Sequence, residues 1–373
     1  MKIGFDAKRA FQNSSGLGNY SRNTINALSL FHPGEEYILF TPDIKTELFD
    51  GYRRFKIVAP QNYVAKKLKS FWRSLFLIPH LKNHQIDVFH GLSNELPNGI
   101  ENSGIPSVVT IHDLVFMRYP EFYQAIDRKI YFKKTRYACK AADKIIAISR
   151  QTRNDIVTFF KVPEEKIEMI YQPVAPVFFD RHEKFPALEK YNLPEEYILS
   201  VGTLEPRKNQ LSLLKAVKHS GISVPVVFVG KETSYAAEMK RFIAENLPGA
   251  QVFFLTNIPE KDLAALYQGA LLSVYISVFE GFGLPVIESM ACGCPVVTST
   301  VSVLPETAGK AALLCNPSDI GDIGSKILML MNDNALRSEL VHKGTKRARQ
   351  FHPELYADKL HELYIKILKE KNA

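Results

Sequence analysis

Short apolar runs alternate with helical segments along nearly the whole chain, and this alternation constrains the fold more than any other feature. In the first half such runs occupy 2–6, 37–40, 55–58, 88–90, 107–111 and 144–148. The second half repeats the pattern at 197–201, 224–229, 251–255, 272–276 and 295–298. Alternation of this kind predicts an α/β fold in which helices cover mostly parallel sheets.

The length of the chain predicts two domains. A chain of 373 residues exceeds what one hydrophobic core usually serves. The segment 171–193 is rich in proline and charge and has no sustained period, so we expect the interdomain linker there. We therefore expect one domain over 1–175 and another over 185–351, with helices in the tail from 319 to 371.

Composition narrows the class of protein without choosing a partner. Hydrophobic residues make up 46% and charged residues 23% of the chain, as in ordinary globular proteins. The net charge of +8 indicates an anionic partner, which nucleic acid, a membrane surface or a phosphorylated substrate would each satisfy. The start, MKIGFDAKRAF, lacks the long apolar segment of a signal peptide, so we expect a cytoplasmic protein.

The cysteines favour a reducing compartment and packing roles. Cys292 and Cys294 are close in sequence, but neither a second pair nor a nearby histidine completes a metal set with them. We expect these two, together with Cys139 and Cys315, to be reduced packing residues, and we expect no metal site.

The stretch 277–297, SVFEGFGLPVIESMACGCPVV, combines glycines, a helix start and two glutamates. Pro285 suits the first helical position, and Gly293 followed by Pro295 suits the end of the helix. Gly281 and Gly283 allow the backbone to approach a ligand closely. The free N–H groups of the first helical turn favour an anion.

We expect Glu280 to lie before this first turn and Glu288 within it, beside an anion site where carboxylates would repel a phosphate. Ionised carboxylates accept hydrogen bonds from vicinal hydroxyls, so the pair is better explained by sugar hydroxyls. A nucleotide diphosphate that carries a sugar satisfies both demands. The alternative is that Glu280 caps the turn and Glu288 is a solvated helix residue.

Further polar residues follow the apolar runs, where open α/β sheets bind their ligands. Arg207 and Lys208 precede a helix that begins near Asn209, and two cations there are unfavourable unless something negative offsets them. Lys231 follows the run 224–229, and His112 follows the run 107–111. A histidine at such a place is more often structural, and His90 is a weaker candidate still. We expect Ser149 to cap the next helix.

Two other segments leave alternatives open. Gly16 and Gly18 precede a helix and could expose N–H groups to a phosphate, but from the residues alone an ordinary strand-to-helix turn is the better explanation. In 63–84, YVAKKLKSFWRSLFLIPHLKNH, basic residues alternate with aromatic and apolar ones. This segment is either a partly buried helix with its lysines on the solvent-exposed face or a contact with an anionic membrane surface.

The string EGFGLPVIE, followed by MACGCPVV, closely resembles the signature of the retaining GT-B glycosyltransferases of family four. The resemblance implies two Rossmann-like domains that face each other across a cleft, with a C-terminal helix at 352–373 returning to the first. It also implies a nucleotide-sugar donor and a glycan or lipid-linked acceptor in surface polysaccharide biosynthesis. HDLVFMRYPE and GLGNYSRN look most like the mannosyltransferase branch, so GDP-mannose is the expected donor.

The resemblance also implies roles for particular residues. It assigns catalysis to His112, Arg207, Lys208 and Glu280. It assigns donor binding to Gly16, Gly18, Lys231, Gly281, Phe282, Gly283, Leu284 and Glu288. Arg207 and Lys208 would take the place of a divalent ion, so we expect no cofactor. If 63–84 contacts an anionic membrane, the protein would lie peripherally at the inner face of the cell membrane.

This chain departs from the family pattern at two points. Ser15-Gly16 stands where many relatives have two glycines, and Thr256 replaces a common glycine. A UDP-sugar donor therefore remains an alternative, as does a non-enzymatic two-lobed binding protein. A nucleic-acid partner is not expected, because only the net charge supports it.

Overall fold

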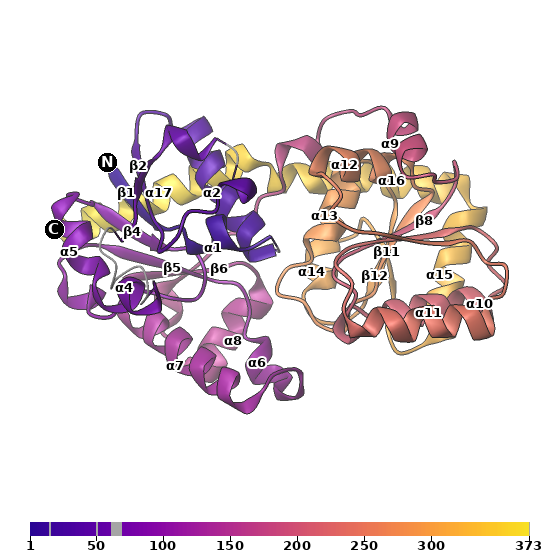
Figure 1. Ribbon diagram of the computed structural model, residues 1–373, viewed down its shortest axis with the longest axis horizontal. Coiled ribbons are helices and arrows are strands. Elements are labelled where there is room, and N and C mark those ends of the chain that lie inside the picture. Colours follow the sequence, from indigo (N-terminus) through magenta and orange to yellow (C-terminus); the bar gives the residue numbers. More distant parts are fainter. Residues whose placement is uncertain (15, 50, 61–68, 373) are drawn as a thin grey trace. The chain divides into compact units, whose positions relative to one another are not determined.

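The computed structural model describes residues 1–14, 16–49, 51–60 and 69–372, which divide into two compact units (Figure 1). Unit 1 comprises Met1–Pro173 and Pro353–Ala373, and unit 2 comprises Val174–His352. Each unit is built on its own parallel sheet with helices on both faces. The division falls inside the segment 171–193, but most of that segment belongs to unit 2.

The sheet of unit 1 has the order β3-β2-β1-β4-β5-β6-β7 within the described residues. Its strands are parallel throughout, and β1 lies between β2 and β4. The strands are β1 (Lys2–Asp6), β2 (Glu36–Phe40), β3 (Lys56–Val58), β4 (Val88–Gly91), β5 (Ser107–Ile111), β6 (Lys144–Ala147) and β7 (Ile167–Met169). The helices are α1 (Lys8–Gln12), α2 (Gly16–Phe31), α4 (Lys69–Leu75), α5 (Leu77–Asn83), α6 (Val115–Arg118), α7 (Ala125–Ala141), α8 (Arg150–Phe160) and α17 (Pro353–Asn372).

The sheet of unit 2 has the order β10-β9-β8-β11-β12-β13 and is also parallel. Its strands are β8 (Ile198–Val201), β9 (Val226–Val229), β10 (Val252–Leu255), β11 (Leu272–Tyr275), β12 (Val296–Ser299) and β13 (Leu313–Cys315). The helices are α9 (Lys184–Lys190), α10 (Gln210–His219), α11 (Ser234–Asn246), α12 (Glu260–Gly269), α13 (Leu284–Ala291), α14 (Leu304–Ala308), α15 (Ile320–Asn332) and α16 (Asn334–Ala348).

The central strands are buried because helices cover both faces of each sheet. All residues of β5 and of β9 are buried, which explains their continuous apolar sequences. Among the described residues of unit 1, one apolar cluster contains Ile3 and Phe5, and another contains Val109 and Ile111. In the described part of the chain, no helix combines the length and the apolarity that a membrane span requires.

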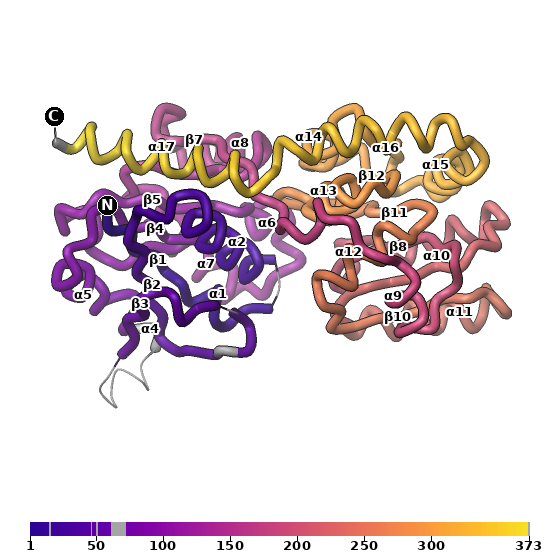
Figure 2. The backbone as a smooth tube through the Cα atoms, turned by 90° about the horizontal axis from the view of Figure 1, so that it is seen from above, coloured from indigo at the N-terminus to yellow at the C-terminus, as the bar shows by residue number. Residues whose placement is uncertain are grey.

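Helix α17 packs against α2 within unit 1 (Figure 2). Tyr356 places its hydroxyl 2.8 Å from that of Tyr20 and 2.9 Å from that of Thr24. Tyr364 places its hydroxyl 2.7 Å from Nδ1 of His90, whose Nε2 lies 2.8 Å from the hydroxyl of Thr110. Both ring nitrogens of His90 thus have hydrogen-bond partners within unit 1, and burial lowers the pKa of His90 to about 3.

The structure confirms the apolar runs as strands of the two sheets. One edge strand of each sheet and the expected linker differ from the prediction. Strands β7 and β13 were not predicted, because three residues are too few to show a period. Within the expected linker, helix α9 forms and packs on α12, where Lys190 Nζ lies 2.6 Å from Asp262 Oδ2.

In each sheet one pair of neighbouring strands marks the point where the strand order reverses. In unit 1 this pair is β1 and β4, and in unit 2 it is β8 and β11. The connections on either side of such a pair lead away in opposite directions, which leaves a crevice outside the carboxyl ends of the two strands. Ligand sites are therefore expected at these two places.

Candidate functional site

In unit 2 the reversal point brings together the segments that follow β8 and β11. The first contains the 3-10 turn Pro206–Lys208, and the second contains Glu280 and the start of α13. A Cβ on Gly230 would lie 2.0 Å from the carbonyl oxygen of Gly202, so the ends of β8 and β9 approach each other closely. A side chain at Gly230 would force these strand ends apart.

Glu280 is the counter-ion of both cations that the sequence singled out. Its Oε1 lies 2.6 Å from Lys208 Nζ and 3.0 Å from a terminal nitrogen of Arg207. Arg207 also pairs with Glu205 at 2.6 Å and donates to the carbonyl of Phe279 at 2.7 Å. The negative partner that two cations at a helix start require is therefore supplied, at least in part, by the chain itself.

The ionisation of this cluster follows from burial and from pairing. Burial by itself would raise the pKa of Glu280, but the charges of Lys208 and Arg207 lower it to about 2. Burial lowers the pKa of Lys208, and the neighbouring Glu280 carboxylate opposes that effect. Glu280 is thus a carboxylate at all physiological pH values, and its side chain is 10% exposed.

Lys208 is held in one position by a residue that the sequence did not reveal. Its ammonium donates to the hydroxyl of Tyr275 at 2.5 Å as well as to Glu280. Tyr275 ends β11, and nothing in its sequence context distinguishes it from other strand residues. An ammonium has three N–H donors, so these two contacts leave one for a further acceptor.

The turn before α13 has backbone donors without an acceptor among the described residues, as the glycines predicted. Gly283 is the N-cap of α13 with φ +90°, and a Cβ there would lie 2.6 Å from a methyl of Leu304. Among the described hydrogen bonds, the N–H groups of Gly281, Gly283 and Leu284 have no acceptor. Pro285 takes the second helical position rather than the first. Gly293, with φ +71°, directly follows the C-cap.

Glu288 differs from the sequence-based interpretation in two respects. It lies in the second turn of α13, one turn beyond the exposed donors. Burial, followed by the charge of Glu260, raises the pKa of Glu288 to about 8, whereas the interpretation required an ionised carboxylate. In this structure the carboxyl is therefore mostly protonated at neutral pH, and its side-chain contact is the hydroxyl of Tyr267 at 3.5 Å.

The remaining predicted residues of unit 2 have distinct surroundings. Lys231 follows β9 and is exposed, and no acceptor among the described residues binds its ammonium. Its carbonyl accepts from the N–H of Leu204. Phe282 is buried, with its ring centroid 5.6 Å from that of Phe351, so its side chain serves packing.

In unit 1 His112 is buried, and both of its ring nitrogens are occupied. Nε2 lies 2.9 Å from the carbonyl oxygen of Leu92, so it carries the proton, and Nδ1 accepts from Gln172 at 3.0 Å. Burial lowers the pKa of His112 to about 4. The ring also stands edge-on to Tyr20, with centroids 4.5 Å apart. These contacts fix a neutral imidazole, and a role beside a sugar stays a prediction.

The two glycines at the start of α2 serve different purposes. The sequence pattern placed both glycines in a loop before the helix. Helix α2 instead begins at Gly16, so both lie in its first turn. A Cβ on Gly18 would lie 1.7 Å from the carbonyl oxygen of Asn13, whereas a Cβ on Gly16 would meet open space. Close packing against the chain's own backbone therefore explains Gly18 without a ligand.

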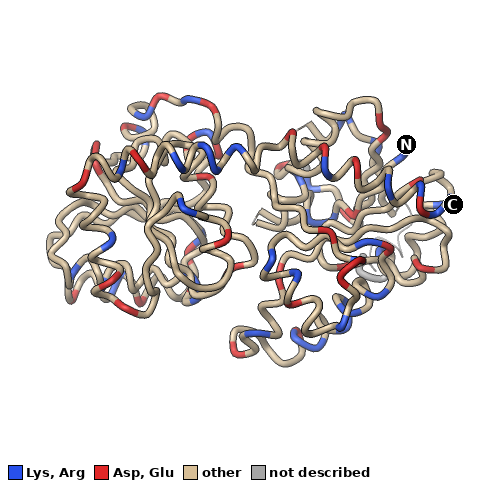
Figure 3. Tube along the Cα trace, turned by 180° about the vertical axis from the view of Figure 1, so that it is seen from behind, with Lys and Arg blue, Asp and Glu red and all other residues tan. Residues whose placement is uncertain are grey.

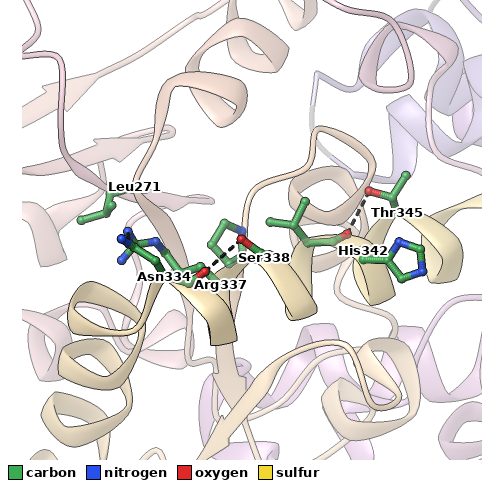
Figure 4. Close-up of a pocket in the computed structure, with 8 residues that line it drawn as sticks. Leu271, Asn334, Arg337, Ser338, His342 and Thr345 are labelled. Atoms are coloured by element: carbon green, nitrogen blue, oxygen red, sulfur yellow. Dashed lines mark hydrogen bonds between the residues drawn. The ribbon is translucent and has the colours of Figure 1, made fainter.

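A pocket of about 620 Å³ lies at the end of the unit 2 sheet where its strands begin (Figure 4). Leu271 and Pro295, which precede β11 and β12, line it together with residues of α16 such as Arg337 and His342. Because the amino ends of parallel strands lie there, the pocket is separate from the Glu280 cluster.

Other sequence expectations concern capping, the cysteines and charge. Ser149 caps α8 by accepting from the N–H of Thr152 at 3.0 Å, as predicted. Cys292 and Cys294 are free thiols. Within the described residues there is no group of three or more His, Cys, Asp or Glu placed to hold a metal ion. Figure 3 shows basic and acidic residues interspersed along both units.

Comparisons with protein families match most of the chain. Residues 14–177 match the family model described as Glycosyltransferase Family 4, and residues 181–347 match the model described as Glycosyl transferases group 1. The O-antigen chain mannosyltransferase B of Escherichia coli is 28% identical over 378 residues, which cover 94% of this chain and 96% of that protein.

Two further proteins show more distant or partial similarity. The serotype-specific mannosyltransferase WbdA of Escherichia coli is 30% identical over 71% of this chain, which spans about a third, 34%, of that longer protein. Among solved structures, Anabaena Alr3699/HepE in complex with UDP-glucose has a TM-score of 0.78 and 16% identity. That alignment covers 98% of this chain and 100% of the Anabaena chain.

Proposed function

The chain belongs to family four of the glycosyltransferases with the GT-B fold, and from this we propose that it transfers mannose from GDP-mannose. The acceptor is a glycan or a lipid-linked glycan in the assembly of a surface polysaccharide. Relatives that act as O-antigen mannosyltransferases support the sugar and the pathway.

The observation that carries the proposal is the Glu280 cluster beside the start of α13. Lys208 is fixed by Tyr275 and Glu280 with one N–H donor remaining, and the N–H groups of Gly281 and Gly283 have no described acceptor. Donors that are already in place stabilise negative charge without reorganisation, which is how a diphosphate leaving group is best stabilised. The donor diphosphate would occupy this place in unit 2.

The reaction would retain the anomeric configuration. The bond between the sugar C1 and the diphosphate oxygen breaks through an oxocarbenium-like state, and the acceptor oxygen forms the new bond to C1 on the same face. The acceptor proton passes to the departing phosphate oxygen. Arg207 and Lys208 stabilise the charge that grows on the diphosphate, a task that other enzymes give to a metal ion.

Glu280 and Glu288 would contact the hydroxyls of the bound donor. Glu280 has one oxygen engaged by Lys208 and Arg207, and a carboxylate can accept further hydrogen bonds, here from the sugar. Glu288 would meet the ribose hydroxyls. A diol donates most strongly to the ionised form, so binding would release the proton that Glu288 holds in this structure.

We further propose that the protein works in the cytoplasm at an anionic membrane surface, through the segment 63–84. Residues 61–68 lie outside the described residues, but the following part carries exposed apolar side chains. Leu75 is 49% exposed and Phe76 is 56% exposed, whereas Trp72 is buried. Apolar side chains beside lysines suit the boundary between lipid headgroups and acyl chains.

A panel of nucleotide sugars tests the donor. GDP-mannose should bind and hydrolyse slowly in the absence of acceptor, and GDP-glucose, UDP-glucose and UDP-N-acetylglucosamine should do so more weakly. NMR of the transferred product should show a retained anomeric configuration, and an inverted product would exclude the mechanism. Preference for UDP-glucose, the ligand of the Anabaena structure, would replace the donor assignment and keep the reaction class.

A further inference from the structure

The reversal point of the unit 1 sheet carries a basic cluster that the donor site does not use. Lys8 and Arg9 directly follow β1, and Glu95 follows β4, the neighbouring strand across the reversal point. Arg73 reaches the same place from α4, and Lys134 reaches it from α7. The cluster therefore occupies the position in unit 1 that the Glu280 cluster occupies in unit 2.

The acidic residues of this basic cluster are already engaged. Arg73 is buried and pairs with Asp6, with 3.0 Å between Nη1 and Oδ2, and also with Glu95. Lys134 shares Glu95, with Nζ 3.3 Å from Oε2. Asp6 also accepts from the backbone N–H of Lys8 at 3.2 Å. Two carboxylates thus neutralise Arg73 and Lys134.

Lys8 and Arg9 are left without such a partner. Among the described residues neither side chain makes a hydrogen bond or ion pair, although both are only partly exposed. Burial, followed by the charges of Arg73 and Arg9, lowers the pKa of Lys8 to about 8. Burial and Arg73 also lower the pKa of Arg9. The charge of Asp6 acts in the opposite direction on both Lys8 and Arg9 but does not cancel these effects. Neighbouring cations held partly out of water are unfavourable, and an anion bound between them would offset the repulsion.

Helix α7 adds an apolar surface next to this cluster. Ile126, Ile130 and Lys134 are four residues apart, so they form one stripe along the helix that ends at the basic cluster. Ile126 is 72% exposed and Ile130 is 44% exposed. Tyr131, the next residue along α7 after Ile130, is also exposed. Exposed branched apolar side chains leading to a basic cluster suit an amphiphile with an anionic head.

We propose that Lys8 and Arg9 bind the phosphoryl group of a lipid-linked acceptor, whose apolar chain lies along Ile126 and Ile130 of α7. This deepens the proposed function, on which the word acceptor rests, but the phosphate site itself depends only on unit 1. Lys and Arg donors bind phosphate oxygens through charge-assisted hydrogen bonds. The apolar chain of the lipid would extend along α7, away from the carboxyl ends of the strands.

Direct binding of two probes tests the site. With GDP present at saturation to occupy the donor site, inorganic diphosphate and farnesyl diphosphate are titrated against the full chain and against Lys8→Gln, Arg9→Gln and Ile126→Ser/Ile130→Ser. The charge variants should each weaken binding of both probes about tenfold, the effect of one charge-assisted hydrogen bond. The isoleucine variant should weaken farnesyl diphosphate alone. Lys140→Gln, the same change on the exposed end of α7, is the matched control and should bind both probes normally.

The outcomes separate this proposal from the donor assignment. Lys8→Arg should restore binding, and the variants should bind GDP-mannose as the unchanged chain does, which shows that they are folded. If the unchanged chain bound both diphosphates equally well, the assignment of a lipid chain to the ligand would be wrong. If Lys8→Gln and Arg9→Gln bound the probes normally, the assignment of the phosphate site to Lys8 and Arg9 would be wrong. Loss of all binding of both probes when GDP is saturating would also overturn it, because the probes would then bind only at the donor site. Failure to use any nucleotide sugar, with diphosphate binding intact, would overturn only the proposed function.

Discussion

Glu280 shows how a single residue changes meaning once its neighbours are known. From the sequence it is a hydroxyl acceptor beside an anion site, whereas in the structure it first holds Lys208 and Arg207 in place. The carboxylate and the cations together form a charge-balanced group with Glu205 and Tyr275, joined by ion pairs and hydrogen bonds. A bound diphosphate would meet side chains that are already oriented, which is the arrangement that favours transition-state stabilisation.

Replacing Arg207 tests the part of this group that faces the leaving diphosphate. Arg207→Ala should lower kcat by about a hundredfold or more, the usual cost of removing one transition-state donor. Binding of GDP-mannose should change much less. Steady-state kinetics and donor titration measure the two effects, and Arg241→Ala on the exposed face of α11 is the control. Normal turnover by Arg207→Ala would contradict the mechanism.

Glu288 predicts a pH dependence of donor binding. Its pKa is raised to about 8, so below that pH the carboxyl is protonated and must lose the proton to accept from the ribose. Affinity for GDP-mannose should therefore rise as pH increases from 6 toward 8, by up to about tenfold per pH unit, and level off above 8. Calorimetric titration across this range measures it. The same slope in Glu288→Gln would show that another group is responsible.

At the scale of elements, function depends on how loops leave the carboxyl ends of strands. The segments after β8 and β11 carry the Glu280 cluster, and those after β1 and β4 carry the basic cluster with Lys8 and Arg9. Helix α13 is positioned by Gly283, because only glycine adopts φ +90° without strain while leaving room for Leu304. Strand–loop–helix geometry thus fixes where backbone donors point.

Substituting Gly283 tests that geometry. Gly283→Ala should destabilise unit 2 by about 1–3 kcal/mol, because the left-handed backbone is strained for alanine and the new Cβ would meet Leu304. It should also weaken GDP-mannose binding by moving the N–H groups of the turn. Denaturant unfolding and donor titration are the measurements. Gly34→Ala, where a Cβ meets nothing within 4 Å, is the control, and equal stability of the two variants would contradict the argument.

The segment 63–84 gives a prediction about membranes. Lys66→Glu, Lys67→Glu and Lys69→Glu together should weaken binding to anionic vesicles, because each cation near such a surface contributes about 1 kcal/mol. Hydrolysis of a soluble donor should survive. Vesicle sedimentation measures binding, with Lys215→Glu, Lys261→Glu and Lys310→Glu in unit 2 as a control of equal charge. Unchanged binding by the first triple variant would mean that the segment only packs on the protein.

At the scale of the whole molecule, the chain repeats one architecture twice and uses the copies differently. Both units have a parallel sheet with one reversal point, yet unit 2 places paired charges there, whereas in unit 1 Lys8 and Arg9 make no hydrogen bond or ion pair with the described residues. Helix α17 joins unit 1 although it follows unit 2 in sequence. The chain therefore divides by packing, and not simply by order along the sequence.

The charge arrangement predicts catalysis without a metal ion. Arg207 and Lys208 would provide the positive charge that a divalent cation gives elsewhere. Turnover measured by release of GDP should therefore be unchanged after dialysis against EDTA. Restored activity on adding magnesium or manganese to an inactive, chelated enzyme would contradict this prediction.

The sequence by itself determined the central strands of both sheets and the turn before α13. Apolar runs, glycines and capping residues act over a few neighbouring positions, so 107–111 and the cap at Ser149 were predictable from local pattern alone. The short edge strands β7 and β13 offered too few residues for such a pattern. The start of α2 at Gly16 was missed because a glycine is a poor helix former.

Only the tertiary structure decided what the polar residues do. Glu280 meets Lys208 across 72 positions of sequence, and Gln172 reaches His112 across 60. Burial raises the pKa of Glu288 to about 8, although its sequence context is that of an ordinary helix residue. Desolvation and ion pairing depend on which distant groups surround a side chain, and folding brings those groups together in a way that no local pattern encodes.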